Sequence, residues 1–364
     1  MNDLARRIQR TYLTLVLGNT IAASFIWGIN TLFLLDAGLS NLEAFAANAF
    51  FTAGMMVFEV PTGVVADTWG RRTSYLLGTL TLSASTFLYY ILWVVEAPFW
   101  QWAVVSMLLG LGFTFFSGAV EAWLVDALHH AEYDGGLEAV LGRGQMIGGV
   151  AMLGGSVAGG VIAQVTSLGV PFLLRVGVLL VMFAVAYRLM HDLGFAPAPA
   201  ASPLRATKAV FDASLEHGLG NPPVRWVMLA APFTAGVGIY TFYALQPFLL
   251  DLYGDPDAYA VAGLAAAIVA GSQILGGYAA PKIRSRFEKR TTALILAALA
   301  GVVVLALLAL VGSFWLALGL LVVWGLLFAA SMPIRQAYLN DMIPSRQRAT
   351  VLSFDSLMGS SGGV

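Results

Sequence analysis

The stretch Gly63-Val-Val-Ala-Asp67-Thr-Trp-Gly70-Arg71-Arg72 ends in a cluster of charged residues and lies between two long apolar runs, 42–66 and 73–95. Each of those runs is longer than the roughly 20 apolar residues that a helix needs to cross the hydrocarbon core of a bilayer. Gly70 permits a sharp turn, and the arginines after it are typical of a cytoplasmic loop. The stretch therefore predicts a tight turn between two transmembrane helices.

Apolar runs of the same kind recur on both sides of this turn. The chain is 59% hydrophobic and only 11% charged, which is too little charge to cover the surface of a soluble domain of 364 residues. We predict an all-α integral membrane protein with ten full transmembrane helices and the start of an eleventh. The predicted spans are 11–35, 42–66, 73–95, 100–127, 144–166, 172–190, 225–250, 258–281, 291–311 and 315–337, and the eleventh begins near 349 and reaches the last residue.

Basic residues alternate between successive loops as the positive-inside rule requires. With a cytoplasmic N-terminus, every one of the 19 Lys and Arg residues except Arg175 falls in a cytoplasmic segment. We therefore predict a multi-pass protein of the cell (inner) membrane with its N-terminus in the cytoplasm. Arg175 is predicted to be an anchor at the outer end of its helix, with its charged head turned toward water.

One long polar connection divides the predicted helices. We expect an N-terminal six-helix bundle at 1–190, a cytoplasmic linker at 191–224, and a C-terminal bundle at 225–364 that is incomplete and ends within helix 11. Apolar residues at helical spacings in the second half of the linker predict a short amphipathic helix along the membrane surface. A disordered linker is the alternative, chiefly for the first half, which is rich in proline and alanine.

Composition excludes several classes of function. The chain has no cysteine, and its four histidines all fall in polar connecting segments, so the predicted spans offer no thiolate or histidine metal site. A net charge of −1 without clustered basic and aromatic residues argues against nucleic-acid binding. No nucleophile with a base, and no cofactor-binding motif, stands within the spans. We expect a protein that is not an enzyme and holds no cofactor.

The spacing within the opening stretch resembles motif A of the major facilitator superfamily: glycine, three residues, aspartate, two residues, glycine and two basic residues. The resemblance implies the major facilitator fold, with two pseudo-symmetric six-helix bundles, and a secondary active transporter that works by alternating access. In that family the motif lies between helices 2 and 3 and gates the conformational change. The resemblance assigns this gating role to Gly63, Asp67, Gly70, Arg71 and Arg72.

Two more charged residues are expected beside the motif. Asp126 falls at the cytoplasmic end of helix 4, where Arg71 can pair with it, and Arg143 at the start of helix 5 can complete the gating network. In the second half, the matching turn at 277–286 has Pro281 in place of the aspartate, so we expect a latch on one side only.

Helix 5 partly resembles motif C of the family's drug:proton antiporters. Its glycines include Gly142, Gly155 and Gly159, but Ser156 stands where that motif has proline. Packing of helices through small residues explains the same glycines and is the favoured interpretation. Export therefore stays a suggestion.

Ionisable residues inside a membrane span mark functional sites by default. Glu59 and Glu121 are the proton-coupling candidates, and hydrogen-bonded structural roles are the alternative. Candidates for a substrate cavity are polar and aromatic residues within the predicted spans, each of which could instead be packing. They are Asn19, Trp27 and Asn30 on helix 1, Tyr240, Tyr243 and Gln246 on helix 7, Gln273 on helix 8 and Trp324 on helix 10.

We predict proton-coupled efflux of small apolar or drug-like compounds by a protein that works as a monomer in the lipid bilayer. The alternatives are proton-coupled uptake of a metabolite, such as a sugar or an organic acid, and a non-transporting membrane sensor. A cavity without paired arginines argues against phosphorylated or strongly anionic substrates.

Overall fold

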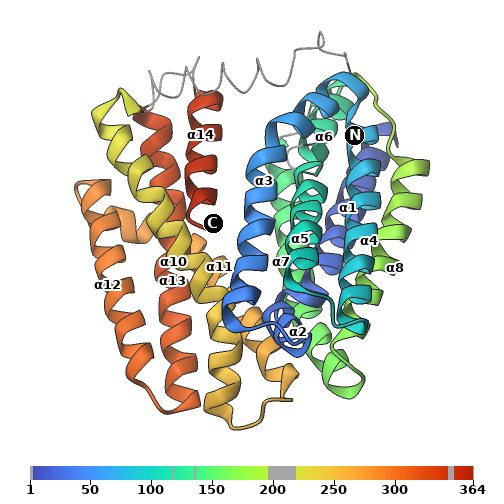
Figure 1. The fold of residues 1–364 in the computed structure, drawn as a ribbon. Helices are drawn as coiled ribbons and strands as arrows, with labels where there is room; N and C mark the ends of the chain where they lie inside the picture. Colours follow the sequence, from blue (N-terminus) through green and yellow to red (C-terminus); the bar gives the residue numbers. More distant parts are fainter. Residues whose placement is uncertain (1–2, 117–118, 135–136, 196–218, 343–347, 364) are drawn as a thin grey trace. The chain divides into compact units, whose positions relative to one another are not determined.

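The computed structural model describes residues 3–116, 119–134, 137–195, 219–342 and 348–363, and all regular structure in these ranges is helical (Figure 1). The helices are α1 (Asp3–Trp27), α2 (Asn30–Asp36), α3 (Asn41–Trp69), α4 (Arg71–Val94), α5 (Phe99–Thr114), α6 (Ala119–His130), α7 (Leu137–Val165), α8 (Gly169–Leu189), α10 (Pro222–Tyr253), α11 (Tyr259–Ser285), α12 (Arg290–Leu310), α13 (Phe314–Met342) and α14 (Arg348–Ser361).

Within the described ranges, nine helical segments are long and apolar enough to cross a membrane. The pair α1 and α2, bent by 46° at its break, makes a tenth when the two are taken as one span. The predicted multi-pass helical membrane protein is therefore confirmed. The arrangement as two six-helix bundles stays a prediction, and so does the number of complete spans.

The chain forms two compact units. Unit 1 is Met1–Thr207 together with Val364, and unit 2 is Lys208–Gly363. Unit 1 contains α1 to α8, and unit 2 contains α10 to α14. The amphipathic helix predicted in the linker falls within 196–218, outside the described residues, and the predicted domain bounds remain predictions.

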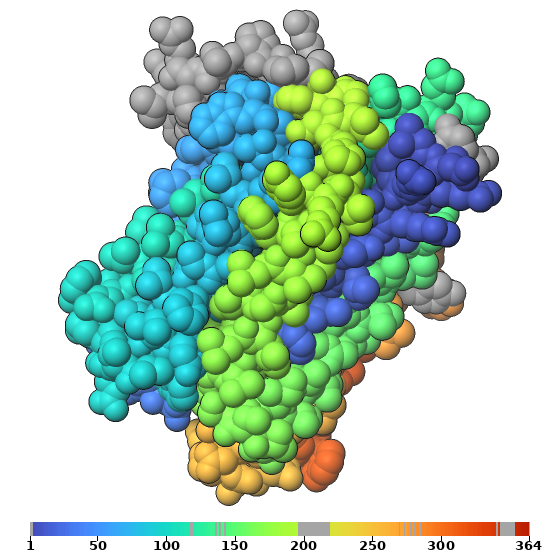
Figure 2. Space-filling model, turned by 90° about the vertical axis from the view of Figure 1, so that its right-hand side faces the viewer, coloured from blue at the N-terminus to red at the C-terminus, as the bar shows by residue number. Residues whose placement is uncertain are grey.

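In unit 1, α3 packs on α5, α1 on α7, and α8 on both α4 and α1. Figure 2 shows α8 lying between α4 and α1. Small residues make the α1–α7 contact possible: a Cβ added to Gly159 would overlap the backbone of Phe25, and one added to Gly155 would overlap the side chain of Ser24. These contacts support the packing interpretation of the helix 5 glycines.

Unit 2 repeats these pairings in the same order along the chain. Its α11 packs on α13 as α3 packs on α5, and α10 packs on α14 as α1 packs on α7. A glycine again makes the second contact close, because a Cβ on Gly362 would overlap the carbonyl of Pro232. The described part of unit 2 therefore repeats two of the helix pairings of unit 1.

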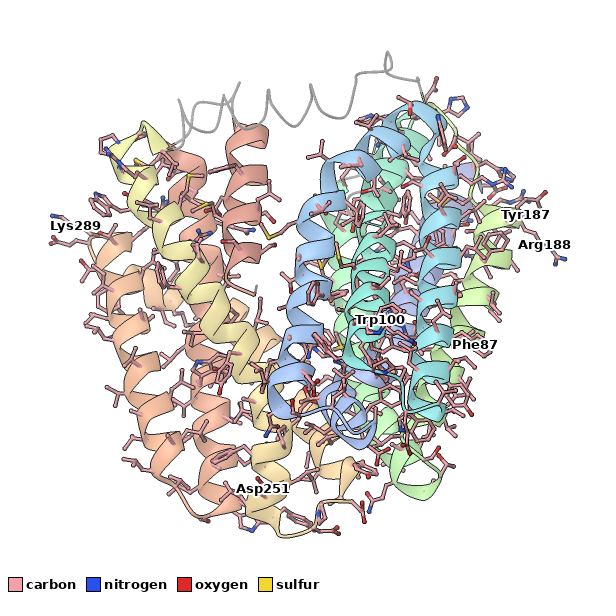
Figure 3. All side chains as sticks on the ribbon, viewed as in Figure 1. Phe87, Trp100, Tyr187, Arg188, Asp251 and Lys289 are labelled. Atoms are coloured by element: carbon pink, nitrogen blue, oxygen red, sulfur yellow. The ribbon has the colours of Figure 1, made fainter. Side chains whose placement is uncertain are left out.

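Large apolar side chains cover much of the surface of unit 1. Phe87 and Trp100 point outward with 46% and 64% of their surface exposed (Figure 3). Exposed apolar surface of this extent suits contact with lipid acyl chains. In unit 2, Asp251 and Lys289 lie at opposite ends of the helices (Figure 3), and the predicted orientation in the membrane stays a prediction.

Candidate functional site

The turn between α3 and α4 consists of one residue, Gly70. Its φ of +103° and ψ of 152° lie in a region that only glycine adopts readily. The sharp turn predicted at this glycine is therefore present. Gly63 differs, because no described atom lies within 4 Å of the position a Cβ would take there.

Arg71 lies between two aspartates of unit 1. Its Nη1 is 2.5 Å from Oδ1 of Asp67, one helical turn earlier, and its Nε is 3.9 Å from Oδ2 of Asp126 on α6. The structure thus places Arg71 beside Asp126, as expected, and adds a pair with Asp67 that was not predicted. Because the Asp67 and Asp126 side chains are 51% and 35% exposed, each ion pair contributes about 0–1 kcal/mol.

Asp192 completes this arrangement and was missed by the sequence analysis. The backbone N–H of Arg72 donates to Oδ1 of Asp192 at 2.9 Å. Gly70 has no side chain with which to cap α4, so Asp192 supplies the acceptor from 120 positions further along the chain. A carboxylate at a helix N-terminus stabilises it by about 0.3–1 kcal/mol.

The chain around the end of α8 surrounds the two arginines. A guanidinium N–H of Arg72 donates to the carbonyl of Tyr187, and its Cζ lies 4.8 Å from the centroid of the Tyr187 ring. Arg71 lies over the ring of Phe195 at 5.9 Å. We call Asp67, Arg71, Arg72, Asp126 and Asp192 the motif cluster; it joins α3, α4 and α6 to the segment after α8. Arg143 is exposed on α7, and its place in the network stays a prediction.

The two proton-coupling candidates lie in different surroundings. Glu59 is half-buried in α3, where its backbone carbonyl accepts a hydrogen bond from the Thr62 hydroxyl at 3.2 Å. Glu121 is exposed in the first turn of α6 and lies close enough to Tyr12 to interact with it electrostatically. This position supports the structural alternative for Glu121 more than for Glu59.

The predicted cavity residues belong to both units, Asn30 to unit 1 and Tyr240, Tyr243 and Gln246 to unit 2. Asn30 donates from Nδ2 to Oδ1 of Asn48 at 2.9 Å and thereby joins α2 to α3. In unit 2, Gln246 is 3% exposed, Tyr243 is half-buried and Tyr240 is 62% exposed. Within unit 2 these three residues of α10 therefore differ in how far they are buried. Their contact with substrate stays a prediction.

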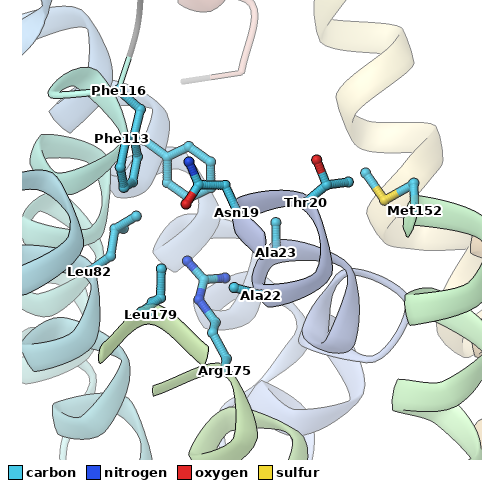
Figure 4. A pocket seen from close by; sticks show the side chains of 10 residues that line it. All are labelled: Asn19, Thr20, Ala22, Ala23, Leu82, Phe113, Phe116, Met152, Arg175 and Leu179. Atoms are coloured by element: carbon cyan, nitrogen blue, oxygen red, sulfur yellow. The ribbon is translucent and has the colours of Figure 1, made fainter. Parts of the chain in front are cut away.

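Arg175 overturns the expectation of an outer anchor turned toward water. It is 4% exposed and lines a cavity of about 220 Å³ inside unit 1 (Figure 4). Its Cζ lies 5.7 Å from the centroid of the Phe113 ring. Asn19, a predicted cavity residue, lines the same space. The complete lining is Asn19, Thr20, Ala22, Ala23, Leu82, Phe113, Phe116, Met152, Arg175 and Leu179.

Unit 2 carries its own ion pair at the corresponding turn. Arg290, the first residue of α12, has Nη1 2.5 Å from Oδ2 of Asp341 near the end of α13. This pair links α12 to α13, as the Arg71–Asp126 pair links α4 to α6 in unit 1. The expectation of a latch on one side only stays a prediction, and the Arg290–Asp341 pair itself was not predicted. The sequence analysis missed it because Asp341 lies far from the turn along the chain.

A second pair in unit 2 is more buried. Both Nη atoms of Arg335 on α13 donate to the carboxylate of Asp355 on α14, each at 2.6 Å, and Asp355 is 7% exposed. The sequence contained a signal for this pair, because Asp355 is an isolated acid within the eleventh apolar run. Ionisable residues inside a membrane span mark functional sites by default, so Asp355 could have been named as a candidate.

Comparison with protein families gives one match: the model described as Major Facilitator Superfamily covers residues 12–364. A search of curated proteins finds no match.

Solved structures share the fold at low sequence identity. A mutant form of the nucleoside transporter NupG aligns with a TM-score of 0.82 at 13% identity, covering 99% of this chain and 89% of that one. A bacterial homologue of the human lysosomal transporter Spinster, inward-facing and unoccupied, gives 0.71 at 18%, covering 100% and 81%. A D-xylose-proton symporter gives 0.67 at 16%, covering 99% and 87%. These likenesses establish the fold.

Proposed function

The chain belongs to the major facilitator superfamily, and from this premise we propose that it is a secondary active transporter that moves a small molecule across the membrane by alternating access. The motif cluster is the observation that supports this proposal. Its Asp67, Arg71 and Arg72 lie in the stretch that resembles the family's gating motif, and the cluster ties three helices of unit 1 to the segment that follows α8.

The strength of the motif cluster suits a latch. The two partly exposed ion pairs, at about 0–1 kcal/mol each, together contribute up to about 2 kcal/mol, and about 1.4 kcal/mol within this range changes a conformational ratio tenfold when the pairs form in only one state. A carrier must visit both of its states, so a contact of this size can bias one state without trapping it. Loss of Arg71 would then shift the balance of states while leaving the fold intact.

For the coupling ion we propose the proton, taken up by Glu59, with Glu121 as the second candidate. For direction we propose efflux of small, largely apolar compounds; uptake of a metabolite such as a sugar or an organic acid is the second version. The glycines of helix 5 give no support to efflux, because the close contacts of Gly155 and Gly159 with α1 explain why glycine is needed at these positions.

The transport test uses purified protein in proteoliposomes with an imposed pH gradient. We expect gradient-dependent flux of at least one solute from a panel of benzoate, uridine, D-xylose, a dipeptide and ethidium. Glu59→Gln should abolish the gradient dependence, and Glu132→Gln, a matched change at an exposed carboxylate, should preserve it. Flux without gradient dependence in the parent would overturn proton coupling, and absence of all flux would overturn the carrier itself.

The gating test measures distances between the two units by electron paramagnetic resonance. Because the chain contains no cysteine, labels can be attached after His129→Cys and Lys289→Cys alone. We expect two distance populations whose ratio changes about tenfold in Arg71→Gln. Arg10→Gln, an exposed arginine on α1, is the matched control. If the ratio of the two distance populations is the same in Arg71→Gln as in the parent, the proposal that Arg71 has a gating role is wrong.

A further inference from the structure

The cavity of unit 1 holds a cation whose environment is otherwise mostly apolar. Arg175 is six residues into α8, which is about 9 Å along the helix from its first residue. The side chain extends into a space lined by residues of α1, α4, α5, α7 and α8, where its guanidinium and the amide of Asn19 point toward the same region (Figure 4).

Arg175 remains charged in this setting, because a guanidinium is not deprotonated in proteins. Among the described residues, no aspartate or glutamate forms an ion pair with it. Its buried Nε has no hydrogen-bond partner in the described structure, and the face of Phe113 compensates the charge only in part. A buried charge without a counterion is strongly unfavourable, so a site of this kind favours an anion.

The rest of the lining indicates which anion. Leu82, Phe113, Phe116 and Leu179 offer apolar surface, while Asn19 and Thr20 add polar groups. One arginine matches one negative charge, and a planar guanidinium matches a carboxylate through two parallel hydrogen bonds. A volume of about 220 Å³ is below the roughly 300–1,000 Å³ of sites for drug-sized ligands, so the ligand is smaller than a drug.

We propose that this cavity binds the carboxylate of a small monoanion with an apolar body, and that Arg175 is the residue that holds it. The inference rests on the proposed transport function, since it names the substrate class of that carrier. It also narrows the proposal, because a small organic monoanion takes the place of a drug-like compound.

Binding is tested at equilibrium on the full-length protein in nanodiscs, with radiolabelled benzoate, phenylacetate and cyclohexanecarboxylate. Each acid is compared with its amide, which has nearly the same shape and no charge. We expect at least one acid to bind saturably and its amide to bind at least tenfold more weakly. This comparison needs only the parent protein, so it holds even where a variant fails to fold.

Three variants assign the binding to the cavity. Arg175→Gln should weaken the acid at least tenfold and remove the preference over the amide. Asn19→Asp keeps the acceptor for the Tyr75 hydroxyl, which donates to Asn19 Oδ1 at 2.7 Å, and adds a carboxylate beside Arg175. Asn19→Asp should therefore abolish binding of the acid while the protein stays folded. Arg188→Gln, at the exposed end of the same helix, should change affinity less than twofold (Figure 3).

The outcomes separate this inference from the transport proposal. Failure of all three acids to bind, equal binding of acid and amide, or unchanged affinity in Arg175→Gln would each overturn the inference. Transport of uridine or D-xylose without acid binding would overturn it and leave the carrier standing. Acid binding that depends on Arg175, without flux of any solute, would support the site and overturn the carrier.

Discussion

Replacing Asp355 by asparagine removes the charge that faces Arg335 and keeps the shape of the side chain. Both Nη atoms of Arg335 donate to this carboxylate at 2.6 Å, and one of them also reaches the carbonyl of Val227 on α10 at 3.3 Å. The pair thus ties α13 and α14 to α10. Its loss should lower the free energy of unfolding of unit 2 while the helices themselves persist.

The burial of the pair sets the size of the effect. Removing one partner of a buried ion pair costs about 3–5 kcal/mol, mostly because the other charge stays buried and unpaired. Asp355 is 7% exposed, but the Arg335 side chain is 21% exposed and keeps the Val227 carbonyl. We therefore expect Asp355→Asn to cost about 3 kcal/mol, at the lower end of this range.

A double-mutant cycle isolates the pair from the individual side chains. Arg335→Met together with Asp355→Leu removes both charges, so it should cost at least about 2 kcal/mol less than the sum of the two single changes. The measurement is reversible unfolding in mixed detergent micelles. Asp341→Asn is the matched control, because Asp341 pairs with Arg290 but is 57% exposed, and it should cost less than about 1 kcal/mol. Equal costs for Asp355→Asn and Asp341→Asn, or an additive cycle, would refute the reasoning.

Two further changes test unit 1 by thermal unfolding. Asp192→Ala should lower stability by about 1 kcal/mol, because it removes the acceptor of the Arg72 N–H at the start of α4; an unchanged transition would show that the contact contributes nothing. Gly159→Leu should cost about 1–3 kcal/mol by overlap with the Phe25 backbone, whereas Gly177→Leu, where no atom lies within 4 Å of the added Cβ, should be near neutral. Equal effects of the two leucines would contradict the packing argument.

The sequence was sufficient to predict where the helices lie. Each predicted apolar run overlaps a helix of the structure, because roughly 20 apolar residues are needed to cross a bilayer and few other structures require such a run. The turn at Gly70 was equally predictable, since a one-residue break with positive φ needs glycine. These features depend on residues that are close together along the chain.

The partners of the motif were only partly predictable. The family pattern pointed Arg71 toward Asp126, but nothing in the residues around Asp192 indicates that it caps a helix 120 positions earlier. The same limit applies to Arg290 and Asp341 in unit 2. A carboxylate finds its partner through the packing of helices, and spacing along the chain carries no information about which loop will lie beside which helix end.

Arg175 shows why burial was harder to predict here than in a soluble protein. On α8 it shares a stripe with Phe172, Leu179, Met182 and Ala186, all of them buried. Arg188, 13 residues later, is rotated by about 220° at 100° per residue and is exposed.

In water, polar residues would mark the outer face of such a helix. In a bilayer the outer face is apolar too, and Leu180 and Val181 are exposed on α8. Hydrophobic periodicity therefore cannot distinguish the two faces, and a single arginine in the run fits an anchor and a buried binding group equally well until the contacts of α8 with α1 and α4 fix its rotation.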